Sequence, residues 1–201
     1  MPSTRSPLQA CVRMLTILAL FAAGCSVPCI KPRGDLSLAH KQEFCRAMAP
    51  YDTEIANAAK RLNVPRSIVS GMIYALSAGK PGLVIEDRLG LMQVHAEEFA
   101  RARKRLGAYA VDIADDPLNP RANIYAGTWL LSHYYEIVRM YTADPLWRFQ
   151  VNDWCRPIKA YLTTPEADYE NCAECPAPGE GRAEYIGGQV LRYARIQHMC
   201  H

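Results

Sequence analysis

Cys172 and Cys175 stand two residues apart, and His198 and His201 near the C-terminus could supply further metal ligands. Zinc sites and redox-active disulfides both use this cysteine spacing. A structural zinc site needs four well-spaced ligands, however, and a thioredoxin-like pair needs a strand and a helix around it. The sequence around this pair shows neither pattern. We therefore favour a structural disulfide and expect no metal and no cofactor.

The N-terminus has the order of a signal peptide. Arg5 and Arg13 precede an apolar stretch at 14–21, which leads through small residues to Cys25. The stretch is shorter than the roughly 20 apolar residues that a membrane-spanning helix needs. The small residues before the cysteine resemble a bacterial lipobox. We therefore predict residues 1–24 as a lipoprotein-type signal and Cys25 as the lipidated first residue of the mature chain.

Lipidation of Cys25 would anchor the protein to a membrane of the cell envelope, facing the periplasm. Ser26, where an aspartate would retain the protein at the inner membrane, favours the outer membrane. Ala22 matches the lipobox less well than leucine does. Simple cleavage followed by secretion is therefore the alternative.

The cysteines of the mature domain are even in number once Cys11 leaves with the signal and Cys25 carries lipid. In an oxidising compartment an even set predicts disulfides, although sequence does not separate the many connectivities that six cysteines allow. The set consists of Cys29, Cys45, Cys155, Cys172, Cys175 and Cys200.

Length and composition predict one folded domain. The chain has 201 residues, of which 50% are hydrophobic, enough for a single core. Its formal charge of +3 arises from lysines and arginines interspersed with acids. No basic block indicates a nucleic-acid partner, and we expect none.

The apolar spacing predicts a mainly α-helical domain over 49–201, preceded by a tether over 25–48. Periodic apolar positions indicate helices beginning near Asp52, after Pro65 and at Asn119-Pro120, with a last helix from Arg182. Asp144-Pro145 predicts one more helix. The segment near 163–181 is rich in proline, acids and cysteine, which indicates a surface insertion. No run of strands is visible.

The order of several short segments resembles a known family. They are the apolar helix from Ile68 to Ser77, Gly90-Leu91-Met92-Gln93-Val94, Asp116-Pro117 followed by Asn123-Ile124 and Gly127, Ala160-Tyr161, and Glu184-Tyr185-Ile186 with Val190. Each is weak alone, but together they resemble soluble lytic transglycosylases and goose-type lysozymes. The resemblance covers nearly the whole mature domain and implies an all-α, lysozyme-like fold.

The resemblance implies an enzyme that cleaves peptidoglycan glycan strands with one carboxylic acid. That acid protonates the glycosidic oxygen, and an apolar pocket raises its pKa so that it stays protonated near neutral pH. The family places it at the end of the second helix, where this chain has Leu76-Ser77-Ala78. Leucine cannot donate a proton, and no aspartate or glutamate occurs between Asn63 and Ile85. We therefore expect lost or much altered catalysis.

The remaining site positions follow from the same resemblance. Glu86 precedes the Gly-Leu-Met-Gln segment and could serve as a relocated general acid, although a solvated loop residue is the simpler interpretation. Ser77, Met92 and Gln93 match residues that line the sugar groove. Tyr161 matches the tyrosine that orients the catalytic acid, and it could still line the groove.

Three function classes follow from these observations. The first is a non-catalytic relative that binds peptidoglycan glycan strands or an envelope protein partner. The second is an active lytic transglycosylase that uses Glu86. The third is a disulfide-stabilised structural lipoprotein, a scaffold of an envelope machine. We expect the first, because the retained Gly-Leu-Met-Gln segment favours a groove that still has a role.

Overall fold

The computed structural model describes residues 36–142, 154–163 and 182–200, and these residues are mainly α-helical, as predicted. Among them the elements run, in chain order, α2 (Leu38–Met48), η1 (Ala49–Tyr51), α3 (Asp52–Leu62), α4 (Arg66–Ser77), β1 (Val84–Ile85), β2 (Arg88–Leu89), β3 (Val94–His95), α5 (Ala96–Leu106), η2 (Gly107–Tyr109), α6 (Pro120–Thr142), α7 (Cys155–Thr163), α8 (Arg182–Ala194) and η5 (Gln197–Cys200).

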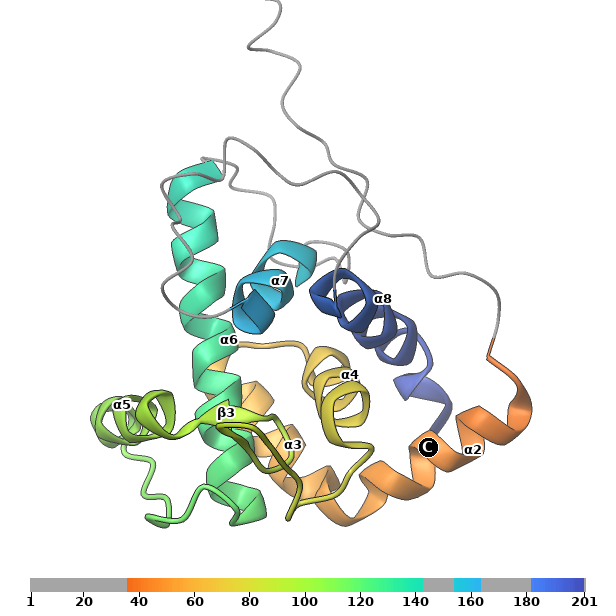
Figure 1. Cartoon of the computed structure of the whole chain (residues 1–201), viewed down its shortest axis with the longest axis horizontal. Helices are drawn as coiled ribbons and strands as arrows, with labels where there is room; N and C mark the ends of the chain where they lie inside the picture. The colour runs from red at the N-terminus through yellow and green to blue at the C-terminus, as the bar shows by residue number, and fades with distance from the viewer. Residues whose placement is uncertain (1–35, 143–153, 164–181, 201) are drawn as a thin grey trace, which may run out of the picture.

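Helix α4 lies at the centre of the domain, with α8 and α3 packed against it (Figure 1). Its contact with α8 depends on Gly71, because a Cβ added there would lie 2.5 Å from the backbone oxygen of Val190. The long helix α6 runs past α3, α5 and α7. The core is one continuous cluster that draws buried apolar residues from all of these helices.

A small antiparallel sheet connects α4 to α5, although the sequence shows no run of strands. The strand order is β1-β2-β3, with Ile85 opposite Arg88 and Leu89 opposite Val94. Each strand has only two residues. Such short strands produce no measurable alternation of apolar and polar residues, so periodicity could not reveal them.

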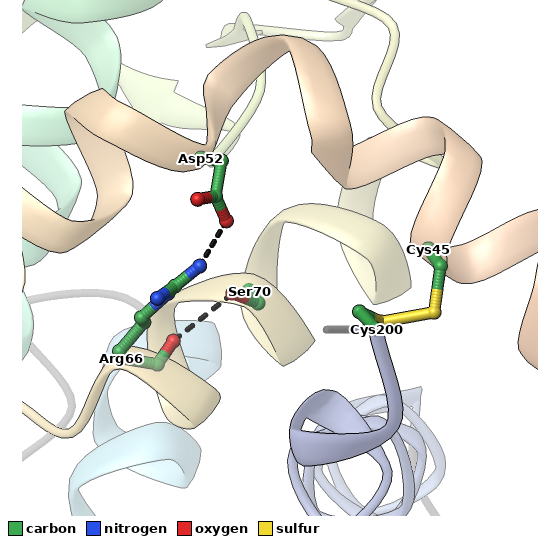
Figure 2. A network of polar contacts seen from close by, with 5 residues as sticks. All are labelled: Cys45, Asp52, Arg66, Ser70 and Cys200. Carbon is green, nitrogen blue, oxygen red and sulfur yellow. Dashed lines mark hydrogen bonds and ion pairs between the residues drawn. A yellow bond between two sulfur atoms is a disulfide. The ribbon is translucent and has the colours of Figure 1, made fainter.

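Helix α2 occupies the last eleven residues of the segment expected as a tether. Its Phe44 and Met48 are buried in the core. A disulfide between Cys45 and Cys200 joins this helix to the C-terminal turn, as Figure 2 shows. The folded part therefore begins before residue 49, because a covalent link and apolar burial hold α2 against the domain.

The start of α3 differs from expectation in one polar contact. The sequence predicts that a helix begins near Asp52, and α3 begins there, but the Asp52 side chain forms an ion pair with Arg66 of α4 rather than a cap on its own helix (Figure 2). Ser70 donates a hydrogen bond to the backbone oxygen of Arg66 at 3.0 Å. Asn119 does cap α6 as predicted, because its Oδ1 accepts from the backbone N–H of Ala122 at 3.0 Å.

Several predictions lie outside the described residues. They are the signal over 1–24, the lipidated Cys25, the tether up to residue 35, the helix at Asp144-Pro145 and the insertion over 164–181. Within the part of the chain that the structure describes, no helix is both long and apolar enough to cross a membrane.

Candidate functional site

The end of α4 is apolar where the family resemblance places a carboxylic acid. Leu76 is partly buried and packs against the core. Ser77 is buried, and its hydroxyl donates to the backbone oxygen of Ile73 at 2.8 Å. Ala78 then ends the helix in the left-handed conformation, with φ of 51°. Neither Leu76 nor Ser77 carries an acid that could protonate a glycosidic oxygen.

Asn123 of α6 fixes the start of the Gly-Leu-Met-Gln segment. Its Oδ1 accepts from the backbone N–H of Met92 at 2.7 Å, and its Nδ2 donates to the oxygens of Leu89 and Pro117 at 2.8 and 2.7 Å. Gly90 has φ of 76°, and a Cβ there would lie 2.5 Å from Asn123 Nδ2. Both the backbone conformation and the space therefore require glycine.

Met92 is a core residue in this structure. Its side chain has no exposed surface and lies on Gly127 of α6, where an added Cβ would meet its Sδ at 2.6 Å. The thioether packs against the helix, an ordinary use of methionine. Met92 was expected to line a sugar groove, but in this structure it has no exposed surface with which to do so.

Gln93 forms hydrogen bonds with the backbone of its own hairpin. Its Nε2 donates to the backbone oxygens of Leu83 at 3.0 Å and Gly90 at 2.7 Å, and only 2% of the residue is exposed. Its φ is 51°, a conformation that costs a non-glycine residue energy and that these hydrogen bonds hold in place. Among the described residues, its buried Oε1 has no hydrogen-bond partner.

Tyr161 of α7 joins the same cluster. Its hydroxyl donates to the backbone oxygen of Met92 at 2.7 Å, and the residue is buried. Burial raises the pKa of this hydroxyl well above its ordinary value, and the charge of Glu98 raises it further. The tyrosine that the resemblance assigns to orienting an acid thus holds a loop carbonyl here.

Arg88 ties the hairpin to the end of α7. Its two guanidinium nitrogens donate to the backbone oxygens of Leu162 at 3.3 Å and Gln93 at 3.5 Å. Glu86, for which the sequence allows a relocated acid or a solvated loop residue, takes no part in these contacts. The structure therefore brings Met92, Gln93 and Tyr161 together and leaves Glu86 outside them.

Glu86 and Asp87 form the exposed turn between β1 and β2. Glu86 has φ of 57° and an exposed side chain, so it lacks the apolar enclosure that a general acid uses. Asp87 Oδ2 lies 2.8 Å from His95 Nδ1. Desolvation acts to raise the pKa of Asp87, but the hydrogen bonds from His95 and from its own backbone, with the charges of His95 and Arg88, together lower that pKa below its ordinary value.

Glu98 is a buried carboxylate that the sequence analysis did not select. It accepts from the Tyr134 hydroxyl at 2.8 Å and lies 3.5 Å from Arg101 Nη2. Glu98 lies four residues before the buried Ala102, on the apolar face of α5. This spacing is the sequence pattern from which its burial could have been predicted. Its partners give it a structural role.

Aromatic rings can stack on sugars, but the large aromatic residues of this domain are mostly in the core. Trp129, Tyr134, Tyr135 and Trp154 are all buried, and Trp147 lies outside the described residues.

Of the predicted disulfide cysteines, Cys45 pairs with Cys200, while Cys29, Cys172 and Cys175 lie outside the described residues, as does the side chain of Cys155. Over the described ranges, no cluster of three or more His, Cys, Asp or Glu residues could hold a metal ion.

The comparison with known families agrees with this arrangement. The model of the transglycosylase SLT domain matches residues 54–171, more than half of the chain. The chain belongs to the transglycosylase SLT domain family. No curated protein matches it. The match includes the end of α4, the hairpin and Tyr161, so the hairpin contacts described above lie within the family domain.

Membership of the SLT family establishes the broad properties of the protein. The fold is the lysozyme-like helical fold of that family, as predicted. The function is lytic transglycosylase-like and related to peptidoglycan, and such proteins typically act in the envelope or periplasm.

Proposed function

We propose that this SLT-family protein is an envelope lipoprotein that binds peptidoglycan glycan strands without cleaving them by the family's acid chemistry. The observation that carries the proposal is Leu76 at the end of α4, together with a Gly-Leu-Met-Gln hairpin whose backbone is held by hydrogen bonds from Asn123 and Gln93. The hairpin that the family resemblance assigns to the sugar groove keeps its framework, while Leu76 stands where the resemblance places the proton donor.

The chemistry of glycoside cleavage supports the loss of activity. The leaving oxygen must receive a proton from an acid within hydrogen-bond reach, about 3 Å. The stretch from residue 63 to 85 contains no carboxylic acid that could replace Leu76. Glu86 is exposed on a turn, and Glu98 is occupied by Tyr134 and Arg101.

The hairpin supports retained binding because its shape does not depend on Leu76. Asn123, Gly127 and Tyr161 hold it from α6 and α7. A hairpin held in this way presents its exposed residues to a ligand at low conformational cost. The buried Oε1 of Gln93, an acceptor without a partner among the described residues, is the polar atom that a ligand hydroxyl could satisfy after a small movement of the loop.

Sedimentation with isolated sacculi tests both halves of the proposal. We expect the oxidised mature chain, prepared without lipid, to sediment with sacculi and with glycan strands stripped of peptides. We expect no release of anhydro-muropeptides by chromatography. Failure to bind either material would contradict the binding proposal.

Substitutions at positions 76 and 86 separate the catalytic alternatives. We expect Leu76→Glu to gain measurable release, because a partly buried carboxyl there recreates the missing donor, whereas the matched Leu76→Gln stays inactive. If the wild type releases anhydro-muropeptides and Glu86→Gln abolishes that release, the chain is an active transglycosylase and the proposed loss of catalysis is wrong.

Lipidation has its own measurement. Mass spectrometry of the envelope fraction should find acyl chains on Cys25, and Cys25→Ser should remove both the acyl mass and the membrane association. A mature chain that is cleaved at the same place but carries no lipid would indicate the secreted alternative.

A further inference from the structure

A cavity distinct from the hairpin lies where α5 and η2 meet α6. Its volume is about 580 Å³, and the side chains that matter to its chemistry are Arg101, Arg105, Tyr109, Trp129 and His133. None of the residues that the sequence analysis selected as a site lines it. Its position away from Leu76 and Gln93 makes it a candidate for a separate contact.

The cavity carries more positive charge than its surroundings neutralise. Arg101 and Arg105 stand one turn apart on α5, so their guanidinium groups repel each other. Arg101 has only a long contact of 3.5 Å to Glu98, and Arg105 has no ion pair with any described residue. Glu136 also lines the cavity, and its carboxylate pairs with Arg139 at 2.9 Å. An anion in the cavity would relieve this repulsion.

One wall of the cavity is flat and aromatic. The rings of Trp129 and His133 stack with centroids 5.1 Å apart and an interplanar angle of 9°. Desolvation lowers the pKa of His133, and the charges of Arg101 and Arg105 lower it further. The imidazole is therefore neutral near pH 7 and can offer an apolar face or a hydrogen bond without adding charge.

We propose that this cavity binds a free carboxylate of a peptidoglycan stem peptide, held by Arg101 and Arg105, with the apolar part of the peptide against Trp129 and His133. The inference rests on the proposed function and adds a peptide contact to the glycan contact. Arginine suits the role because its planar guanidinium pairs with a carboxylate through two parallel hydrogen bonds. Stem peptides combine such carboxylates with small apolar side chains.

Isothermal titration calorimetry with the mature chain tests the proposal. The probes are stem peptides released from sacculi by an amidase, the same peptides with amidated carboxyl groups, the peptide-free glycan strands and inorganic phosphate. We expect the free peptides to bind and Arg105→Gln to weaken their binding about tenfold, as the loss of one charge-assisted contact predicts. Amidation should weaken binding similarly, and the affinity for glycan strands should not change.

Arg103→Gln is the matched control, because it removes the same charge from the same helix. Arg103 is paired with Asp115 at 2.8 Å and does not line this cavity. Equal weakening by both variants would reduce the effect to overall charge and overturn the proposal. Absence of peptide binding, or phosphate binding without peptide binding, would also overturn it. Loss of glycan binding alone would instead contradict the proposed function. Circular dichroism would show that each variant is folded.

Discussion

The hairpin region and the end of α4 differ in how they use polar groups. In the hairpin, Asn123, Gln93 and Tyr161 hold backbone atoms of one loop through hydrogen bonds of 2.7 to 3.0 Å. At the end of α4, Leu76 packs against the core and the hydroxyl of Ser77 bonds to its own helix. One region is held by buried polar contacts between elements, and the other by apolar packing.

This difference teaches which family residues the fold itself requires. Gly90, Met92, Asn123, Gly127 and Tyr161 contact one another, so each supports the position of the others. A catalytic acid supports nothing but the reaction, and a leucine in its place still fills the space. Under the proposed function, the motif persists as a scaffold without the proton donor.

The largest expected effect concerns the α4 side, where a disulfide holds two elements that flank the helix. Cys45 and Cys200 are 155 residues apart in sequence, and α2 and η5 both contact α4. Because the bond restricts a long loop in the unfolded chain, we expect Cys45→Ser with Cys200→Ser to lower the free energy of unfolding by about 4 kcal/mol. Urea denaturation measures this change.

Met199→Ala is the control for the disulfide, because this exposed neighbour of Cys200 should change stability by less than about 0.5 kcal/mol. Hydrogen exchange should show lost protection first in α2. Equal loss of protection in the hairpin would mean that the two regions depend on the same contacts and would remove the distinction between them.

The next effect concerns the hairpin side. Asn123→Ala leaves a buried N–H and two partly buried carbonyl oxygens without their partner, so we expect a loss of about 3 kcal/mol in the free energy of unfolding. Asn57→Ala, an exposed asparagine of α3, is the matched control and should have little effect. A small loss at Asn123 would show that packing rather than polar contacts holds the hairpin.

The smallest expected effect is a change in the pH dependence of stability, and it concerns His133 of α6. Its folded pKa lies below the ordinary 6.5, so the unfolded chain binds the proton more readily. This residue's contribution to stability is therefore complete above about pH 6.5 and is lost as the pH falls through the folded pKa. Urea midpoints at pH 7.5 and 5 should differ less in His133→Gln than in the wild type, and an unchanged difference would contradict the proposed environment.

Much of the helical framework could be predicted from sequence because it follows local rules. Apolar spacing located α3 and α4, and Asn119-Pro120 located the start of α6. Helix α2 was missed because polar residues interrupt its apolar positions, and because its burial depends on Phe44, Met48 and a bond to Cys200. Glu98 was missed as a buried group because its partner Tyr134 lies on another helix.

Sequence by itself determined the family, the mainly helical fold and the absence of an acid between residues 63 and 85, since each depends on residue identity and order. Only the tertiary structure decided what the retained motif does. The hydroxyl of Tyr161, the amide of Gln93 and the thioether of Met92 could all have faced a ligand. Each is turned toward the loop or α6 instead, because a buried polar group takes the nearest partner and a buried apolar one the nearest space.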